Sequence, residues 1–452
     1  MRTALLLTFG LGVTLVSGRA HALQSMEAFL AAAHEHNPEV QAADASMRQR
    51  EAEALQARGK LLPSLTARGA FVHNQYEAVA TLPAAAGAPP ITLTIQPQNQ
   101  LDAFFTLDVP LVDLAQFARY GSAKIQAELA DATRAVTRRQ LDERVIRAYA
   151  LLNGASAVVR SAEQSVNVAD KNRAQVTDRV KGGVSSELDY ERANANYERA
   201  KQDLADGQLS RTLAARSLET LSRITPEAVG DFPDDDLHSE TPLPEWVARA
   251  TEELPERRVS QIERRYADAG RDAARLAFVP VLSAQAQEHL TNATGFTGRV
   301  SSYTLSAVAT VRFDFGLVPQ IDAAKAASEN VAARAEGTRR STEDAIVEAW
   351  HRIGANIVKA QAARAQAKSF ARAAQIASDR YELGAATQLD VTQAQRDAFV
   401  ADVGRIQSNL DLMQSRAILR LVSGYPPNAQ SPSAPVSSVP PLRSGPATKE
   451  SK

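Results

Sequence analysis

The sequence contains no cysteine among its 452 residues. Disulfides, thiolate metal sites, cysteine nucleophiles and a lipid-modified N-terminal cysteine are therefore excluded. Aromatic residues make up only 5% of the chain, although 44% of it is hydrophobic. Such a composition, built on Ala, Val and Leu, suits slender helices better than a thick globular core. The formal net charge of −1 argues against nucleic acid as a partner.

Long apolar runs are scarce, and the clearest one stands at the start of the chain. Arg2 precedes an apolar segment at 4–16, and residues 20–22 read A-H-A, which fits a small-residue cleavage site. A membrane anchor needs about 20 apolar residues, more than this segment supplies. We therefore predict that residues 1–22 are a signal peptide that is cleaved on export.

The rest of the chain consists of two similar halves. Pro38 and Pro63 recur as Pro255 and Pro280, with an offset of 217 in both cases. Further on, an offset of 201 relates Asp113 to Asp314, Tyr149 to Trp350, Gly183 to Gly384, Leu188 to Leu389 and Asp189 to Asp390. The difference of 16 residues is an insertion at Thr81–Gln98, whose prolines and small residues predict a loop.

This duplication predicts the domain organisation. The first repeat occupies residues 23–230, and a linker with the start of the second repeat occupies 231–253. The second repeat covers 254–424, and the Pro/Ser-rich end at 425–452 is expected to be a disordered tail.

Each half contains two segments with a hydrophobic period of two, which predicts one β-hairpin per half and four strands per chain. The segments are Tyr303–Asp314 and Val281–Leu290 in the second half, and roughly Ser64–Tyr76 and Leu101–Val109 in the first. The apolar-face candidates are Phe71, Phe105, Leu107, Val109, Leu282, Tyr303, Leu305, Val311 and Phe313. In a cytoplasmic protein, these strands would read as a half-buried sheet that packs on helices.

Because the protein is predicted to be exported, a sheet that lies in a membrane is favoured instead. Strands of about ten residues with one apolar and one polar face are long enough to cross a bilayer. Four strands cannot close a barrel, and open sheet edges are not tolerated in lipid. If the sheet lies in a membrane, the protein must therefore oligomerise, with the apolar faces toward lipid.

The remainder of each half is predicted to be helical and long, because no proline occurs between Pro110 and Pro226 or between Pro319 and Pro426. A continuous helix over residues 113–182 would extend about 100 Å at ~1.5 Å per residue. A heptad seam runs through Val145, Ala148, Leu152, Ala155, Val159, Ala162, Val166 and Ala169. Two helices, or one kinked helix, are expected before the first strand, with the break at Asn37-Pro38.

Glycines interrupt both long helical runs. Gly182 and Gly183 are suited to end one helix, and Ser186 with Asp189 forms a capping box that starts the next. The second half repeats the arrangement with Gly384, Thr387 and Asp390. Both sites are predicted to be the tip turns of long helical hairpins, and the first role expected of the two aspartates is helix capping.

Catalytic and metal-binding chemistry is not indicated. His34 and His36 lie two apart, so on a helix they do not face each other. Residues 234–236 are three aspartates without the spaced ligands of a calcium loop, and they are interpreted as a solvated linker. Nucleophile elbows, phosphate loops and zinc motifs are missing from the sequence. We expect no enzyme activity and no cofactor.

The order of these features resembles the TolC family of outer-membrane efflux proteins. Alongside the duplication, the shared elements are NPEV at 37–40, LLPSL at 61–65, FDFG at 313–316 and YELGAATQLDVTQA at 381–394. The resemblance implies a homotrimer with a twelve-stranded β-barrel in the outer membrane and a coiled-coil α-barrel in the periplasm. It also implies a periplasmic adaptor (membrane fusion protein) and an inner-membrane pump of the RND, MFS or ABC type as partners.

In TolC-like channels the hairpin tips close the periplasmic entrance and contact the adaptor. The resemblance matches Asp189, Tyr381 and Asp390 to tip residues of the family, and the candidates for gate or adaptor contacts are these three together with Arg179, Glu187 and Arg380. The match is incomplete, since Ala386 and Gln393 stand where TolC has an arginine and an aspartate. A gate here is therefore expected to use Arg179 or Arg380 with Glu187 and the two aspartates.

The sequence is compatible with two functions. One is a passive outer-membrane conduit of a tripartite efflux or type I secretion assembly, extending into the periplasm. The other is a periplasmic coiled-coil adaptor or scaffold without a pore of its own, although adaptors usually carry one helical hairpin per chain.

Overall fold

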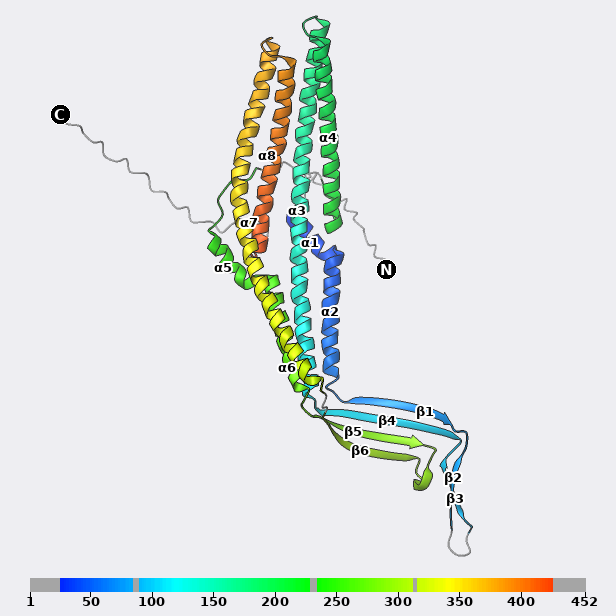
Figure 1. Ribbon diagram of the computed structural model, residues 1–452. Helices are drawn as coiled ribbons and strands as arrows, with labels where there is room; N and C mark the ends of the chain where they lie inside the picture. Colours follow the sequence, from blue (N-terminus) through cyan, green and yellow to red (C-terminus); the bar gives the residue numbers. More distant parts are fainter. Residues whose placement is uncertain (1–24, 84–88, 228–233, 312–314, 426–452) are drawn as a thin grey trace, which may run out of the picture. The chain divides into compact units, whose positions relative to one another are not determined.

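The computed structural model describes residues 25–83, 89–227, 234–311 and 315–425 (Figure 1). The predicted signal peptide, the tail from 426 onward and Phe313 lie outside these residues. The chain divides into two compact units. The described residues of the first lie within 25–37, 141–240 and 351–418, and those of the second lie within 38–140, 241–350 and 419–425.

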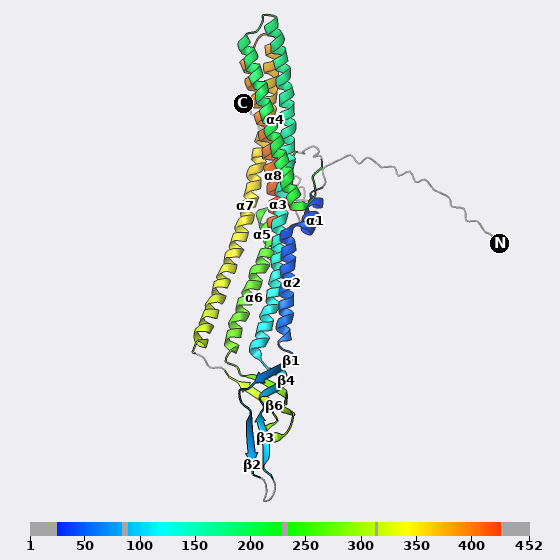
Figure 2. The ribbon, with the colours of Figure 1, turned by 90° about the vertical axis from the view of Figure 1, so that its right-hand side faces the viewer.

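Four long helices form two hairpins, as the proline-free runs predict. The first hairpin consists of α3 (Leu114–Lys181) and α4 (Glu187–Ser222), and the second of α7 (Leu317–Glu382) and α8 (Gln388–Val422). Helix α3 is 68 residues long and α7 is 66 residues long. Figures 1 and 2 show the two helices of each hairpin side by side. None of the helices in the described ranges combines the length and the apolar character needed to cross a membrane.

The predicted heptad seam is the buried stripe of α3 in the first unit. Val145, Leu152 and Val159 are at most 2% exposed, and the intervening seam alanines up to Ala169 are also buried. Small residues allow the helices to approach closely: a Cβ built on Gly154 would stand 2.9 Å from Cδ2 of Leu410 in α8. The equivalent seam of α7 is buried at Ile346, Ile353 and Ala360 among others.

Shorter helices precede each sheet segment. Helices α1 (Met26–His36) and α2 (Pro38–Gly59) meet at Asn37, whose extended backbone at φ −72° and ψ 127° is the conformation that a following proline favours. Helices α5 (Leu243–Glu253) and α6 (Pro255–Leu276) meet in the same way at Leu254. Of the two predicted alternatives, two helices or one kinked helix, the structure therefore has two helices that are separated at Asn37-Pro38.

Within the second unit, polar contacts join α3 to its neighbours. An Arg134 Nη1 atom lies 3.4 Å from Asp44 Oδ1 of α2, and Arg139 Nε donates to Glu256 Oε1 of α6 at 2.7 Å. The helices that precede the two sheet segments are thus held against the same long helix.

The predicted four strands form one antiparallel sheet in the order β1-β4-β5-β6. They are β1 (Ser64–His73), β4 (Asn99–Val112), β5 (Val281–Thr291) and β6 (Ser301–Thr310). The pairing of β4 with β5 joins the strands of the two repeats. Among the described residues, β1 and β6 each pair on one side only and are the edges of the sheet.

Two details of the strand prediction are wrong. The insertion at Thr81–Gln98 is not simply a loop, because β2 (Ala78–Leu82) and β3 (Ile91–Gln96) form a separate antiparallel pair. The β-branched residues of these short segments favour strands despite the prolines around them. In addition, β6 ends at Thr310, so Val311 lies just beyond the strand.

Candidate functional site

The tip of the first hairpin has the geometry that its glycines predict. Gly183 has a φ of +71°, in the left-handed region that glycine adopts without strain. The Val184 N–H donates to the Arg179 carbonyl at 2.8 Å, and the Gly183 N–H donates to the Val180 carbonyl at 3.0 Å. These two bonds are a Schellman motif, which satisfies the last carbonyls of α3. Gly182 precedes the left-handed residue and forms part of the turn.

The second tip repeats this geometry closely. Gly384 has a φ of +74°, the Ala385 N–H donates to the Arg380 carbonyl at 2.8 Å, and the Gly384 N–H donates to the Tyr381 carbonyl at 3.0 Å. The duplication seen in the sequence therefore extends to individual hydrogen bonds.

Both return helices begin with the predicted capping pair. The Asp189 N–H donates to Ser186 Oγ at 3.2 Å, and the Ser186 N–H donates to Asp189 Oδ2 at 3.2 Å. At the second tip, the Thr387 N–H and hydroxyl donate to Asp390 Oδ2 at 2.8 and 2.7 Å. Hydrogen bonds from the Thr387 side chain and backbone, with a smaller effect from the charge of Arg380, lower the pKa of Asp390 from its ordinary value.

The two tips contact each other through Arg179 and Tyr381. Arg179 Nη1 donates to the Tyr381 backbone carbonyl at 2.8 Å, and the guanidinium carbon lies 4.6 Å from the centroid of the tyrosine ring. Tyr381 is only 6% exposed and packs in an apolar cluster with Val176, Ala193 and Val391. Sequence analysis named both residues as candidates for gate or adaptor contacts, but it did not predict that they contact each other.

The expected ion pairs between tip arginines and tip carboxylates are not formed within the single chain. Among the described residues, neither Arg179 nor Arg380 has a carboxylate oxygen of Glu187, Asp189 or Asp390 within 4.0 Å. Asp189 instead has Arg192 on its own helix, with 3.9 Å between Oδ1 and Nη1. The capping bonds hold both aspartates toward their own helix ends, which explains why Arg179 finds its partner in Tyr381 instead.

The tips also expose apolar side chains that the sequence reading missed. Four residues within or next to the turns are at least half exposed: Val184 at 70%, Leu188 at 58%, Leu383 at 84% and Leu389 at 50%. Leu188 and Leu389 occupy equivalent positions in the two repeats. This recurrence of a leucine beside each turn was the sequence signal that could have indicated an exposed apolar residue at the tips. Exposed apolar side chains clustered at one end of a molecule are typical of a contact surface.

The sheet separates most apolar from most polar side chains, as its alternation predicts, although Glu288 lies between Phe105 and Tyr303 on the apolar face and accepts from the Ser301 hydroxyl. The strand register places six predicted lipid-facing residues on one face: Phe71, Phe105, Leu107, Leu282, Tyr303 and Leu305. All six are between 39% and 76% exposed in the single chain. One row across the sheet, Leu65, Leu107, Ala286 and Leu305, is apolar throughout.

The opposite face carries a ladder of polar contacts between β4 and β5. Gln285 Nε2 donates to Asp108 Oδ1 at 3.0 Å, and Gln287 Nε2 donates to Thr106 Oγ1 at 3.3 Å. His289 continues the ladder at the next alternate position of β5. A sheet with one exposed apolar face and one hydrogen-bonded polar face can separate lipid from water.

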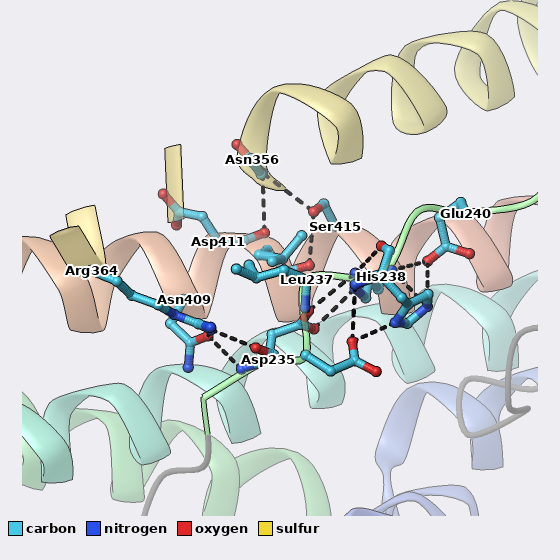
Figure 3. A network of polar contacts seen from close by, with 12 residues as sticks. Asp235, Leu237, His238, Glu240, Asn356, Arg364, Asn409, Asp411 and Ser415 are labelled. Atoms are coloured by element: carbon cyan, nitrogen blue, oxygen red, sulfur yellow. Dashed lines mark hydrogen bonds and ion pairs between the residues drawn. The ribbon is translucent and has the colours of Figure 1, made fainter. Parts of the chain in front are cut away.

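The segment between the repeats is anchored in the first unit, which corrects the interpretation of its aspartates as a solvated linker. Arg416 of α8 donates from Nε and Nη2 to the two carboxylate oxygens of Asp235 at 3.0 and 3.1 Å. The same guanidinium pairs with Glu240, and the Arg416 and Glu240 side chains are only 4% and 3% exposed. Figure 3 shows Asp235, His238 and Glu240 gathered at this network, with Arg364 and Asn409 beside Asp235.

Three potential metal ligands lie in this network. One ligand atom each from Asp235, Asp236 and His238 lie within 4.8 Å of one another, as in a metal site. Both Asp235 oxygens, however, already accept from the buried Arg416 guanidinium, which supplies the positive charge. His34 likewise has a structural partner, since its Nε2 lies 2.6 Å from Asp142 Oδ1.

Solved structures share this fold. A membrane protein from Pseudomonas aeruginosa has a TM-score of 0.75 and 20% identity, covering 90% of this chain and 92% of its own. The Campylobacter jejuni CmeC outer membrane channel has a TM-score of 0.75 and 15% identity, with 90% and 88% covered. The open state of the Neisseria gonorrhoeae MtrE outer membrane channel has a TM-score of 0.70 and 18% identity, with 89% and 90% covered.

The family comparison covers both repeats. A comparison with curated proteins gave no match. The sequence profile named "Outer membrane efflux protein", in contrast, matches residues 29–222 and 246–425, the greater part of the chain. With its mostly helical, duplicated architecture and its small sheet, the chain has the TolC-like fold, and it belongs to the outer membrane efflux protein family.

Proposed function

We propose that this chain is the outer-membrane channel of a tripartite efflux or type I secretion system, a passive duct across the periplasm and outer membrane. The observation that carries the proposal is the two-faced sheet. Six apolar residues predicted to face lipid lie exposed on one face, and hydrogen-bonded polar residues lie on the other. A lipid-facing surface that backs onto a water-filled lumen requires this separation.

The sheet further supports a homotrimer. Its edge strands β1 and β6 each pair on one side only within the described residues. Open edges in hydrocarbon leave backbone groups without hydrogen bonds, at a cost of several kcal/mol for each group. Three chains with four strands each would join β6 of one to β1 of the next and close a twelve-stranded barrel.

The helical hairpins would continue this barrel as a coiled-coil duct in the periplasm. The exposed apolar residues of the tips, such as Leu188 and Leu383, would contact a periplasmic adaptor, and a pump of the RND, MFS or ABC type would supply the energy. We further propose that Asp189 and Asp390, brought together in three copies, line the closed entrance and attract cations. A capping aspartate in the tip turn is close enough to the chain reversal to serve both roles.

Export by a cleaved signal peptide at 1–22 fits this location, and the lack of cysteine fits a protein that is not a lipoprotein. The proposed repeats span 23–230 and 254–424, joined by the linker segment at 231–253 and followed by a tail at 425–452.

Membrane fractionation tests the proposal against the alternative, a periplasmic adaptor or scaffold without a pore. The channel is expected in the outer-membrane fraction and is expected to need detergent for release, because its apolar sheet face is in lipid. Recovery in the soluble periplasmic fraction without detergent would contradict the channel and support the adaptor.

A further inference from the structure

Asp102 on β4 and His289 on β5 form a hydrogen-bonded pair on the polar face of the sheet. His289 Nε2 lies 2.8 Å from Asp102 Oδ1, and the other carboxylate oxygen accepts from Gln100 Nε2 at 2.8 Å. The Asp102 side chain is 9% exposed, whereas that of His289 is 32% exposed. The carboxylate is therefore sheltered, and the imidazole is the partner that water and ions reach.

An aromatic stack holds the imidazole in place. The rings of Phe104 and His289 lie nearly parallel, at an interplanar angle of 8° and a centroid distance of 4.3 Å. Phe104 stands opposite His289 in the register of β4 with β5, and Arg68 stands opposite Phe104 on β1. The pair lies toward the end of the sheet where β4 begins, away from the end that continues into α3.

Few charges share this face with the pair. On the described strands, the ionisable residues of the polar face are Arg68 on β1, Asp102 and Asp108 on β4, and His289 on β5. Strand β6 contributes only Ser302, Thr304, Ser306, Val308 and Thr310 to this face. One positive and two negative groups leave a net charge of −1 while His289 is neutral, and protonation of His289 brings the sum to zero.

We propose that Asp102 and His289 set a pH-dependent cation preference at the outer end of the channel. The inference rests on the proposed function, because it requires the polar face to line the lumen of a closed barrel. Imidazole changes its charge between about pH 5 and pH 8. While the imidazole is neutral, the face keeps its net charge of −1 and three copies attract cations, whereas a protonated imidazole cancels one negative charge per chain and removes the preference.

Reversal potentials test the pair directly. The full-length mature trimer is placed in a planar bilayer under a KCl gradient, at about pH 8 and at about pH 5, either side of the imidazole titration. For the wild type, the ratio of potassium to chloride permeability is expected to fall about threefold between the two conditions, as one charge per chain is cancelled at close range in water. His289→Gln is expected to remove this fall.

His73→Gln is the matched control, because His73 stands at the end of β1 on the opposite face and bonds to Asn99. This variant should keep the wild-type dependence on pH. Carboxylates elsewhere contribute equally to all three proteins, so the difference between His289→Gln and wild type isolates one imidazole. An identical pH dependence in His289→Gln and wild type would overturn the inference.

Asp102→Asn supplies a second, independent test. It should abolish the cation preference that this face contributes at the higher pH, because it removes one of the two negative charges of the face. An unchanged permeability ratio in a correctly assembled Asp102→Asn trimer would also overturn the inference. The failure of the proposed function has a different signature: the wild-type protein would then form no ion-conducting pore at either pH.

Discussion

Arg179, in the last turn of α3, donates a 2.8 Å hydrogen bond to the backbone carbonyl of Tyr381 in the last turn of α7. Its guanidinium also lies over the tyrosine ring at 4.6 Å. The contact joins the tips of the two hairpins within one chain. Its repeat equivalent, Arg380, has no such bond to a tip residue among the described contacts, so the duplication is broken where the two tips meet.

Removal of Arg179 should loosen the proposed periplasmic entrance. A hydrogen bond from a charged donor contributes about 1.5–3 kcal/mol, and a cation–π contact at an exposed site about 0.5–1 kcal/mol. Arg179→Ala is therefore expected to raise single-channel conductance in a planar bilayer. Arg192→Ala is the control, because Arg192 has only a 3.9 Å contact with Asp189. Equal conductance of the two variants would show that the tip contact does not restrain the entrance.

The adjacent glycines of the first tip should respond differently to alanine. Gly183 has a φ of +71°, where a Cβ strains the backbone by about 1–2 kcal/mol. Gly182 has no such conformation, and a Cβ there would lie at an ordinary 3.5 Å from the Asp178 carbonyl oxygen. Gly183→Ala should therefore make the tip more sensitive to limited proteolysis, and Gly182→Ala should leave it unchanged. The reverse order of sensitivity would contradict the turn described here.

The tip turns were predictable because their determinants are local. A left-handed glycine and a capping box each involve residues within a few positions, so Gly183, Ser186 and Asp189 carry the information in their spacing. The contact of Arg179 with Tyr381 was not predictable. It joins residues about 200 positions apart and uses a backbone carbonyl, which the residue type does not reveal.

Protonation of Asp390 should weaken the second tip in acid. Hydrogen bonds from Thr387 lower the pKa of this carboxyl in the folded protein, with a smaller effect from Arg380. A lowered folded-state pKa gives stability that is present above the ordinary carboxyl pKa and is lost as the pH falls through the folded value. Hydrogen exchange at the start of α8, corrected for intrinsic pH effects, should therefore rise in acid.

Thr387→Val tests the cause of this pH dependence. It removes the side-chain hydrogen bond that contributes most to the lowered pKa of Asp390. The acid-induced rise in exchange should then begin at a higher pH than in the wild type. An unchanged onset would show that the Thr387 hydroxyl does not hold the carboxylate in its charged form.

Loss of the Arg416 guanidinium should destabilise the first unit strongly. Arg416→Met leaves the buried Asp235 and Glu240 carboxylates uncompensated, and removal of one partner of a buried pair costs about 3–5 kcal/mol. Arg216→Met removes a pair whose arginine is 72% exposed, with an expected effect below about 1 kcal/mol. Thermal unfolding followed by circular dichroism compares the two. Equal melting temperatures would contradict the structural role given to the linker.

The linker and the insertion show where sequence patterns are insufficient. Asp235 stands in a run of three aspartates that looks solvated, and its partner Arg416 lies 181 positions away on α8. The strands β2 and β3 are only 5 and 6 residues long and flank prolines and alanines, so their alternation is too brief to be distinguished from a loop. By contrast, the alternation at Tyr303–Asp314 was long enough to predict that a strand exists there and that Tyr303 and Leu305 share a face, although β6 runs from Ser301 to Thr310.

The two faces of β6 should tolerate charge differently. Leu305 lies on the apolar face and is 72% exposed, whereas its neighbour Ser306 lies on the polar face. An arginine in contact with lipid costs about 2–4 kcal/mol near the bilayer midplane, and lumen-facing substitutions are tolerated. Leu305→Arg should reduce the yield of assembled trimer in the outer membrane, and Ser306→Arg should leave it near wild type. Equal yields would argue against lipid contact.

The ionic conductance of the purified mature protein in a planar bilayer tests the central claim most directly. A passive duct with a polar lumen is expected to give stepwise conductance without any nucleotide, and the step should increase when the tip contact of Arg179 with Tyr381 is removed. A bilayer that stays electrically silent although the protein is inserted, in the wild type and in Arg179→Ala alike, would contradict the account.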